Sequence, residues 1–366
     1  MRKRVRISWP SQLILFSLFL LVRCAGSQDT SQKNIVIRWK NNQAVGLSMA
    51  LSQFKAHSKE TLPELLKVQL TNSKTAILGD YSIQSDSVIF EPLIPFTPSL
   101  RYEVLLENRL VGEIDIPQAV SSTTLIGIYP SQDTLPENLL KFYFVFSHPM
   151  REGHSLVYVS LLDAKGDTLP NTFLNLQPEL WNAEKTVLTL WLDPGRIKRD
   201  LQPNKSLGAP LTKGNHYTLV VSERWPDESG ARLTQSYTKR FVAATRDITS
   251  PDVKSWTIKT PSKGTTQALE IHVKEALDYV LLQNTIWIID AQGKTINGVI
   301  QVSNKEHLVD FIPASPWLAG AYKVQMESRL EDLAGNNLNR LFDRDITDRR
   351  TKPSQQTVFE LNYRID

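Results

Sequence analysis

The sequence predicts an all-β protein made of tandem β-sandwich domains, and three observations support this. The chain has 366 residues, which suits two or three domains of roughly 100 to 150 residues better than one small sandwich. Its 20 prolines and 16 glycines fit many short strands joined by turns. Short runs in which apolar and polar residues alternate recur along the chain, as they do in half-buried strands.

The N-terminus predicts export from the cytoplasm. Basic side chains crowd the first six residues, and a nearly all-apolar run follows at Leu13–Val22. This order is typical of a secretory signal peptide. The apolar run is short for a permanent membrane span, although an N-terminal membrane anchor is the alternative interpretation.

The cleavage site has two interpretations. Cys24 is the single cysteine and directly follows the apolar run, which resembles the position of the lipid-modified cysteine in bacterial lipoproteins. That pattern places a small residue where this chain has Arg23. Cleavage after Ser27 suits the ordinary signal peptidase and would release a soluble protein. We therefore expect a signal peptide within residues 1–27, cleaved before Cys24 or after Ser27, and a lipid-anchored, periplasmic or secreted product.

Removal of the signal also removes the positive charge. Five of the 42 basic residues lie in that segment, which leaves 37 against 38 acidic residues. A broad basic face for nucleic acid is therefore not expected. With no pair of thiols in the mature chain, no disulfide framework is expected either.

Three units follow the signal, at residues 30–119, 122–246 and 250–366. The second and third echo one another, because Leu161–Asn171 aligns with Ile288–Gly298, and Leu211–Leu233 aligns with Leu318–Leu338. Echoes at this spacing indicate tandem copies of one domain type. In the third unit, Asp332 and Gly335 are expected to form the tight turn of a closing hairpin.

The second unit also carries a longer motif. A strand ending Phe146-Ser147-x-Pro149-Met150 follows Pro130-x-x-Asp133-x-x-Pro136. Together with Asp332–Asn336, this resembles the bacterial Ig-like domain first described in the surface-layer protein SbsA. The resemblance is closest over 122–246, fair over 250–345 and weak over 30–119. It implies tandem immunoglobulin-like β-sandwiches that serve as structural or adhesive modules of exported proteins, and it implies no reaction.

The third unit departs from that motif. Where Phe-Ser-x-Pro-Met would fall, the chain reads His272–Leu277 (HVKEAL). We therefore expect its second strand to lie at an edge or to carry a bulge.

Motifs for catalysis, cofactors and metals are missing. The chain has no Gly-x-Ser-x-Gly, no phosphate-binding loop, no His-Glu-x-x-His and no dinucleotide fingerprint. Paired carboxylates of a glycoside hydrolase can be far apart in sequence, so a hydrolase stays a third hypothesis. His148 and His154 lack a third ligand and suit a solvated turn. The acidic side chains of Glu327, Glu331 and Asp332 lack the order of a calcium loop. We predict no enzyme activity, no cofactor and no metal.

One loop is a candidate binding surface. The segment Asp193–Gly208 is longer than a hairpin needs and carries Arg196, Lys198 and Arg199, which could bind an anionic ligand or partner. Alternatively, Ile197 and Leu201 cover the end of the sandwich and the charges stay solvated.

Tryptophans could form a platform for sugars. Three fall at turns or strand ends, where exposure is expected, and four lie within strand patterns, where burial is expected. The first group is Trp181, Trp225 and Trp317; the second is Trp39, Trp191, Trp256 and Trp287.

The leading hypothesis is an exported cell-envelope protein that acts as a non-enzymatic structural or interaction module. Its partners would be other envelope proteins or surface polymers, with the membrane reached through the possible lipid anchor. The alternative is a module that binds a glycan or an anionic ligand through the 193–208 loop and exposed tryptophans.

Overall fold

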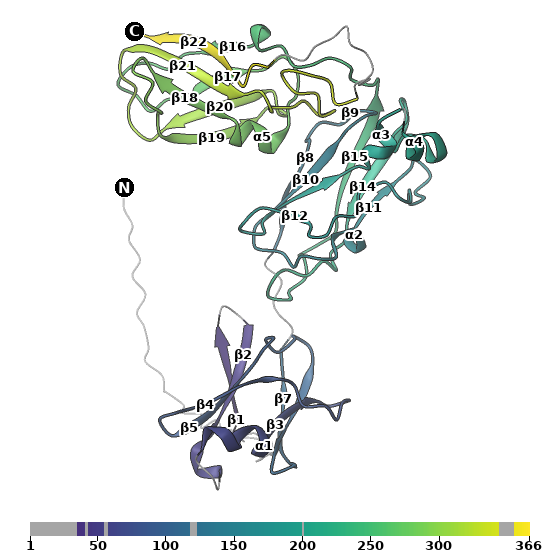
Figure 1. The fold of residues 1–366 in the computed structure, drawn as a ribbon, viewed down its shortest axis with the longest axis vertical. Coiled ribbons are helices and arrows are strands. Elements are labelled where there is room, and N and C mark those ends of the chain that lie inside the picture. The colour runs from purple at the N-terminus through teal and green to yellow at the C-terminus, as the bar shows by residue number, and fades with distance from the viewer. Residues whose placement is uncertain (1–34, 41–42, 55–57, 118–122, 200, 344–354) are drawn as a thin grey trace, which may run out of the picture. The chain divides into compact units, whose positions relative to one another are not determined.

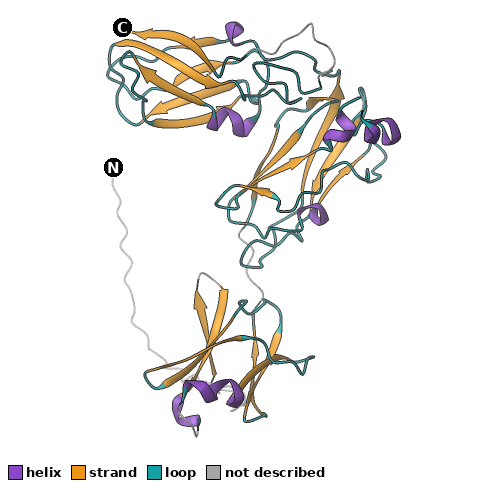
Figure 2. Ribbon diagram, in the orientation of Figure 1, coloured by secondary structure: helices purple, strands orange, loops and turns teal. Residues whose placement is uncertain are grey.

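The computed structural model describes residues 35–40, 43–54, 58–117, 123–199, 201–343 and 355–366 (Figure 1). The predicted signal peptide and Cys24 lie outside these residues. The contacts divide the chain into two compact units, with the main boundary between Asp115 and Ile116. Strands and loops dominate both units, and the helices are short (Figure 2).

The first unit contains two sheets, with strand orders β1-β2-β5-β4 and β3-β6-β7. A short helical segment precedes β3 and consists of the turn η3 (Lys59–Thr61) and helix α1 (Leu62–Leu65). The remaining elements of this unit are β1 (Ile35–Lys40), β2 (Gln43–Ala50), η2 (Leu51–Gln53), β3 (Leu66–Leu70), β4 (Gly79–Gln84), β5 (Ser87–Pro92), β6 (Arg101–Leu106) and β7 (Arg109–Asp115).

The second unit contains two domains, which we call the second and third domains of the chain. The second domain has two four-stranded sheets, ordered β12-β13-β10-β8 and β11-β14-β15-β9. All pairs are antiparallel except β9 with β15, which is parallel. Its elements are β8 (Leu125–Tyr129), β9 (Thr134–Pro136), β10 (Lys141–Phe146), α2 (Ser155–Tyr158), β11 (Val159–Leu162), β12 (Leu180–Trp181), β13 (Val187–Trp191), α3 (Pro194–Ile197), α4 (Gln202–Leu207), β14 (His216–Val221) and β15 (Tyr237–Ala244).

The third domain repeats this plan with one strand fewer. Its sheets are ordered β16-β17-β20-β19 and β18-β21-β22. Its elements are η4 (Val253–Ser255), β16 (Thr257–Lys259), β17 (Leu269–His272), α5 (Tyr279–Asn284), β18 (Ile286–Asp290), β19 (Gly298–Ser303), β20 (Leu308–Pro313), β21 (Gly320–Glu327) and β22 (Val358–Ile365). The protein is therefore all-β, with tandem Ig-like sandwiches, as the sequence predicted.

Each of these two sandwiches has its own apolar core. In the second domain Phe142, Phe144 and Phe146 alternate along β10 and point between the sheets, where they are almost fully buried. In the third domain Ile286 and Ile288 of β18 face Val324 and Met326 of β21. Burying one such side chain stabilises a fold by about 1.5–3 kcal/mol, so the cores need no covalent support.

The sequence echoes have a common physical cause. The Asp163 carboxylate accepts the backbone N–H groups of Lys165 and Asp167 at 2.8 and 3.0 Å. The Asp290 carboxylate accepts the backbone N–H groups of Gln292 and Lys294 in the same way, at 3.0 and 2.9 Å. Aspartate recurs in these turns because its short carboxylate can satisfy the backbone of the turn that follows it.

In the third domain His272–Leu277 stands where the second domain has its Phe-Ser-x-Pro-Met motif, yet the strand and bridge geometry of the two domains is the same. Strand β17 lies between β16 and β20 in a regular register, so the expectation of an edge or bulged strand is wrong. The isolated bridge from Met150 to Asp227 has its counterpart in the bridge from Leu277 to Asp332. Both Met150 and Leu277 are fully buried, and Leu277 therefore takes the place of the motif's methionine.

Candidate functional site

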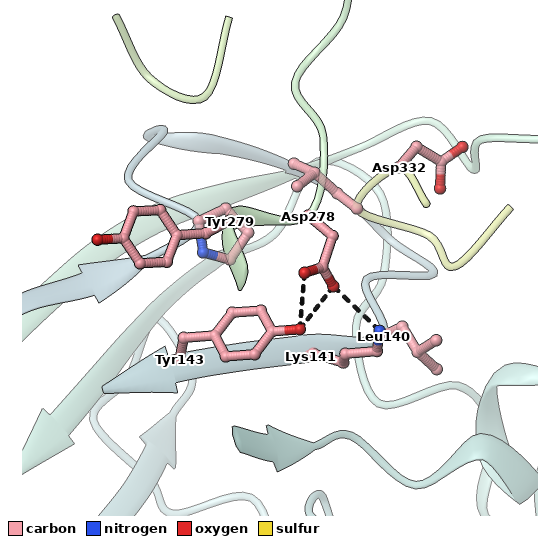
Figure 3. Close-up of a pocket in the computed structure, with 8 residues that line it drawn as sticks. Leu140, Lys141, Tyr143, Asp278, Tyr279 and Asp332 are labelled. Carbon is pink, nitrogen blue, oxygen red and sulfur yellow. Dashed lines mark hydrogen bonds and ion pairs between the residues drawn. The ribbon is translucent and has the colours of Figure 1, made fainter. Parts of the chain in front are cut away.

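The candidate site lies where the second domain meets the third, and β10 provides its first half. Side chains alternate between the two faces of a strand, so Lys141 and Tyr143 point away from the core that receives Phe142 and Phe144. On an uncovered sheet these two would face water. Tyr143 is only 5% exposed, because the third domain covers this face of β10 (Figure 3).

Asp278 of the third domain provides the second half. It is the N-cap of α5, where its carboxylate accepts the Leu281 N–H at 2.9 Å. The same carboxylate accepts the Tyr143 hydroxyl at 2.6 and 2.8 Å and lies 3.0 Å from Lys141 Nζ. One side chain thus caps a helix of its own domain and binds two groups of the other, and Figure 3 shows the bonds to Tyr143 and Lys141.

Glu331 completes the cluster, with Oε2 at 2.6 Å from Lys141 Nζ. Burial alone would lower the pKa of Lys141, but attraction by Asp278 and Glu331 outweighs it, so this pKa is raised. Burial also raises the pKa of Glu331 despite the opposing effect of Lys141, and burial with the Asp278 charge raises that of Tyr143 far above its ordinary value. Tyr143 is therefore a donor to Asp278. We call Lys141, Tyr143, Asp278 and Glu331 the charged joint.

Backbone and ring contacts surround the charged joint. Leu140 donates its N–H to the Leu333 carbonyl at 3.0 Å. The rings of Tyr129 and Tyr279 stack with their centroids 3.5 Å apart. Gly335 has φ of +82°, and a Cβ there would collide with the Leu140 side chain. Glycine is therefore required at 335 both by the turn and by the close approach of the other domain.

A second set of contacts joins the β19–β20 turn to the second domain. Both carboxylate oxygens of Glu306 accept the Ser131 N–H at 3.0 Å, and Lys305 pairs with Asp133 at 2.9 Å. Asn304, Lys305 and Glu306 all have positive φ, between +48° and +62°. Such a run is strained in residues other than glycine, and these contacts with the second domain help to hold it.

Three carboxylates gather beside the charged joint. The oxygens of Asp247, Glu275 and Asp332 lie within 4.8 Å of one another. Asp332 already accepts the N–H groups of Ala334 and Asn336 and the Asn336 amide. Burial, helped by the charge of Asp247, raises the pKa of Asp332 to about 8. The proton that Asp332 binds at neutral pH therefore relieves the repulsion in this group.

The predicted binding loop has a different geometry from that expected. Arg196 is 8% exposed, and its guanidinium donates to backbone carbonyls on two sides of the loop, including Asn171 at 2.8 Å and Gly208 at 3.0 Å. It therefore joins the two ends of the loop and ties the loop to the turn at 170–171. Ile197 packs into the core as the alternative proposed, whereas Leu201 is 44% exposed.

The other two basic residues of the loop contact the third domain's segment at 342–343. Lys198 Nζ lies 4.4 Å from the centre of the Phe342 ring. Arg199 Nε is 3.0 Å from the Asp343 carboxylate, which Arg246 also reaches at 2.8 Å. The loop thus adds a third contact between the two domains.

The remaining candidates are single, partnered side chains. His148 and His154 are exposed, and His148 Nδ1 lies 2.9 Å from Ser147 Oγ. Glu327 pairs with Arg329, whereas Glu331 belongs to the charged joint. Among the described residues, the grouping suited to a metal is the trio beside the joint rather than the acidic run considered in the sequence.

Two expectations for the tryptophans are wrong. Trp225 and Trp317 are buried, at 0% and 2% exposed, because each packs among other aromatic rings. Trp39, expected in the core, is 50% exposed. Trp256 is buried as expected. The described residues thus offer no cluster of the predicted exposed tryptophans.

Sequence reasoning missed the charged joint. One usable signal was β10 itself, where Tyr143 is an aromatic residue on the face opposite to three phenylalanines. A second was Asp278 before Tyr279–Asn284, a helix N-cap pattern. Neither signal identifies the partner, because the contacts span about 140 and 190 residues of sequence.

No family model matches the chain, and no curated protein matches it. Among solved structures, the MG0-NIE-MG1 segment of alpha-2-macroglobulin from Escherichia coli is 11% identical over 56% of this chain and 66% of that one, with a TM-score of 0.22. The N-terminal part of the bacterial S-layer protein SbsC is 14% identical over 56% and 40%, with a TM-score of 0.23. Titin domains A168–A170 are 10% identical over 82% and 92%, with a TM-score of 0.25. The chain thus spans less than two thirds of the first two structures. TM-scores this low carry no argument, and the description of the fold rests on the strand pairing alone.

Replacing Gly335 by alanine tests the close contact of the joint. Gly293 is a matched control, because its φ of +80° is nearly the same and nothing lies within 4 Å of its missing Cβ. Gly293→Ala should cost about 1–2 kcal/mol of unfolding free energy from backbone strain alone. Gly335→Ala should cost roughly 1–3 kcal/mol more, because Leu140 must move. Urea denaturation measures both, and equal losses would contradict the contact.

Asp332 predicts a pH dependence of stability. Its pKa is about 8 in the folded protein against an ordinary value of 3.8 for this side chain, so the folded state binds the proton more tightly than the unfolded state does. The stabilisation that comes from protonated Asp332 is complete below about pH 4 and is lost as the pH rises through about 8. Relative to Asp332→Asn, the native protein should lose about 1 kcal/mol per pH unit between roughly pH 5 and 7.

Denaturation curves across this pH range check the expectation. Asp227→Asn is the matched control, because Asp227 bonds the corresponding turn at Ala231 N and lies outside the carboxylate trio. Parallel pH profiles for the native protein and Asp332→Asn would refute the assignment.

Proposed function

We propose that this protein is an exported, non-enzymatic scaffold of the cell envelope, in which the second and third Ig-like domains act as one spacer of fixed geometry. The charged joint carries the proposal. A buried ion pair adds little net stability, because desolvation offsets the attraction. Its hydrogen bonds have strict geometry, however, so the pair penalises every arrangement in which it is broken. Fixed geometry between domains is what a spacer requires.

Several features support the envelope as its location. The N-terminal pattern is that of a signal peptide, and Cys24 is placed for a lipid anchor that would hold the protein at a membrane. Among the described residues, no helix is both long and apolar enough to cross a membrane. The resemblance of residues 122–246 to the SbsA-type Ig-like domain fits a surface module whose partners are other envelope proteins or surface polymers.

The alternative of a glycan- or anion-binding module gains no support from the site. Arg196 is engaged with backbone carbonyls at the end of the loop and in the neighbouring turn at 170–171, and Lys198 and Arg199 contact the third domain. Two of the three tryptophans expected at the surface are buried. The loop is better explained as part of the domain interface.

The rigid spacer is tested by breaking the joint. Lys141→Met leaves Asp278 and Glu331 buried without a cation, which should cost about 3–5 kcal/mol. Lys259→Met is the control, because its 2.6 Å pair with Glu270 has an exposed lysine end, and surface pairs of this kind contribute little to stability. Denaturation measures the loss. A result in which both variants lose equally little would refute the joint as a structural constraint.

Spin labels measure the geometry directly. Val157 in the second domain and Val299 in the third are 72% and 61% exposed, so cysteines there should accept labels in a Cys24→Ser background. Pulsed dipolar spectroscopy, with labelled protein diluted by unlabelled protein, should give one narrow distance distribution. Lys141→Met should broaden it and Lys259→Met should not. A broad distribution in the otherwise native protein would contradict a rigid spacer.

Export and anchoring have a separate test. Cells fed a fatty-acid analogue should label the native protein, and Cys24→Ser should abolish the label and move the protein out of the membrane fraction. An unlabelled protein found outside the cytoplasm would refute the anchor and leave export in place. A protein that stays in the cytoplasm would refute export.

A further inference from the structure

Among the residues that the structure describes, no strand pairs with the outer edge of β22, the last strand of the third domain. Strand β22 pairs with β21 along all eight of its residues, with no break in register. It is the terminal strand of its sheet. The turn η4 lies near β22, yet within the described residues no backbone hydrogen bond of η4 reaches it.

The second domain shows how this edge is covered elsewhere in the same chain. In the second domain, β15 corresponds to β22 and β14 corresponds to β21. Strand β15 pairs with β14 on one side and with the parallel strand β9 on the other. Strand β9 covers β15 at Val242–Ala244. The third domain has no described strand in the position of β9, so within the described part of the chain the outer edge of β22 has no partner strand.

The direction of the free backbone groups follows from one hydrogen bond. Ser328 donates its N–H to the Thr357 carbonyl at 2.9 Å, so Thr357 points its backbone toward β21. Backbone direction alternates along an antiparallel strand. The N–H and C=O groups of Glu360, Asn362 and Arg364 therefore point away from β21, toward the open edge.

Strand β22 lacks three of the features that protect natural edge strands from pairing with another chain. Natural edges carry proline, a bulge or an inward-pointing charge. Here the inward-facing residues between Glu360 and Arg364 are Leu361 and Tyr363, the eight pairs are regular, and no proline is present. An edge of this kind is a template for another strand.

The outward side chains indicate what that strand is. Glu360, Asn362 and Arg364 are all exposed, and they form the order acidic, neutral, basic. We propose that β22 binds β22 of a second copy of this chain, antiparallel and centred on Asn362. Glu360 of each copy then lies opposite Arg364 of the other, and about six backbone hydrogen bonds join the two strands.

The charges select this register over its neighbours. A pairing centred on Leu361 places Glu360 opposite Asn362 and Arg364 opposite Val358, so both ion pairs are lost. Opposite charges directly across a strand pair are favourable and like charges unfavourable. Arg364 is free to turn, because it is 73% exposed and its contact with Asp366 is exposed as well. Glu360 is held on the outer face by Lys323 and Gln325.

The inference goes beyond the spacer and does not depend on the charged joint. A single pair of strands makes a small contact, so we expect a weak dimer that forms reversibly with concentration. Two dimerising copies would present their second domains as a symmetric pair.

Sedimentation equilibrium of the purified full chain, from about 1 µM to about 1 mM, tests the dimer. Arg364→Glu places like charges across the strands and should weaken association about 10- to 30-fold. Glu360→Arg should do the same. A chain with both changes restores opposite charges and should recover association, and an equimolar mixture of the two single variants should form heterodimers.

Two control variants and one further disrupting variant fix the interpretation. Arg240→Glu makes the same change of charge on an exposed side chain of β15 and should leave association unchanged. Lys141→Met should also leave it unchanged, which separates this contact from the charged joint. Asn362→Pro removes the central outward N–H at an edge where proline is tolerated and should abolish the dimer while far-UV circular dichroism stays native.

The outcomes are decisive in either direction. A native protein that stays monomeric to about 1 mM overturns the proposal, and so does a dimer that survives both Arg364→Glu and Asn362→Pro. Weakening by each single reversal, with recovery in the double variant, supports the register centred on Asn362. If either reversal prevents folding, the heterodimer test is replaced by Asn362→Pro, whose failure to dissociate the dimer also overturns the proposal.

Discussion

The Lys141 ammonium, held between Asp278 and Glu331, is the constraint on which the joined second and third domains depend. An isolated ion of this kind in the interior would be destabilised by several kcal/mol. It is tolerated because two carboxylates of the other domain lie at 3.0 and 2.6 Å and because Tyr143 fills a further acceptor site on Asp278. None of these groups can leave alone without exposing the others to an apolar surrounding. The interface therefore has one favourable arrangement rather than a continuum of sliding ones.

Other features of the two domains make sense around that cluster. Asp278 can serve it because the same carboxylate caps α5, and this bond to the Leu281 N–H fixes the orientation of the side chain. Gly335 allows the Asp332 turn to lie against Leu140. The loop at 193–208, too long for a hairpin, brings Lys198 and Arg199 to the segment at 342–343. Residues that look like an anion site in the sequence thus have a structural role, since their partners are a ring and a carboxylate of the same chain.

The sequence predicted the features whose cause is local. Strand alternation, aspartate turns such as Asp163 and Asp290, and the recurrence of the domain all depend on residues a few positions apart. The errors share a different cause. Trp225 and Trp317 fall in turn-like sequence, yet distant rings bury them; Trp39 alternates like a core residue, yet its side chain is half exposed. Arg196 is basic and in a loop, yet carbonyls on both sides of that loop enclose it. The joint lay beyond local reasoning, because Lys141 and its two carboxylate partners are 137 and 190 residues apart in the sequence.

Strands β15 and β22 differ in how their outer edges are covered. Both are last strands of one domain type, but β9 covers the edge of the first and no described strand covers the second. A chain of such domains can therefore use two kinds of contact with different physics. The joint rests on buried charges, which salt screens weakly. The β22 edge rests on backbone hydrogen bonds and on exposed charges, which salt screens strongly. Raising ionic strength should then loosen the contact between copies before it affects the contact between domains, so the geometry of the spacer is preserved while its association is adjusted.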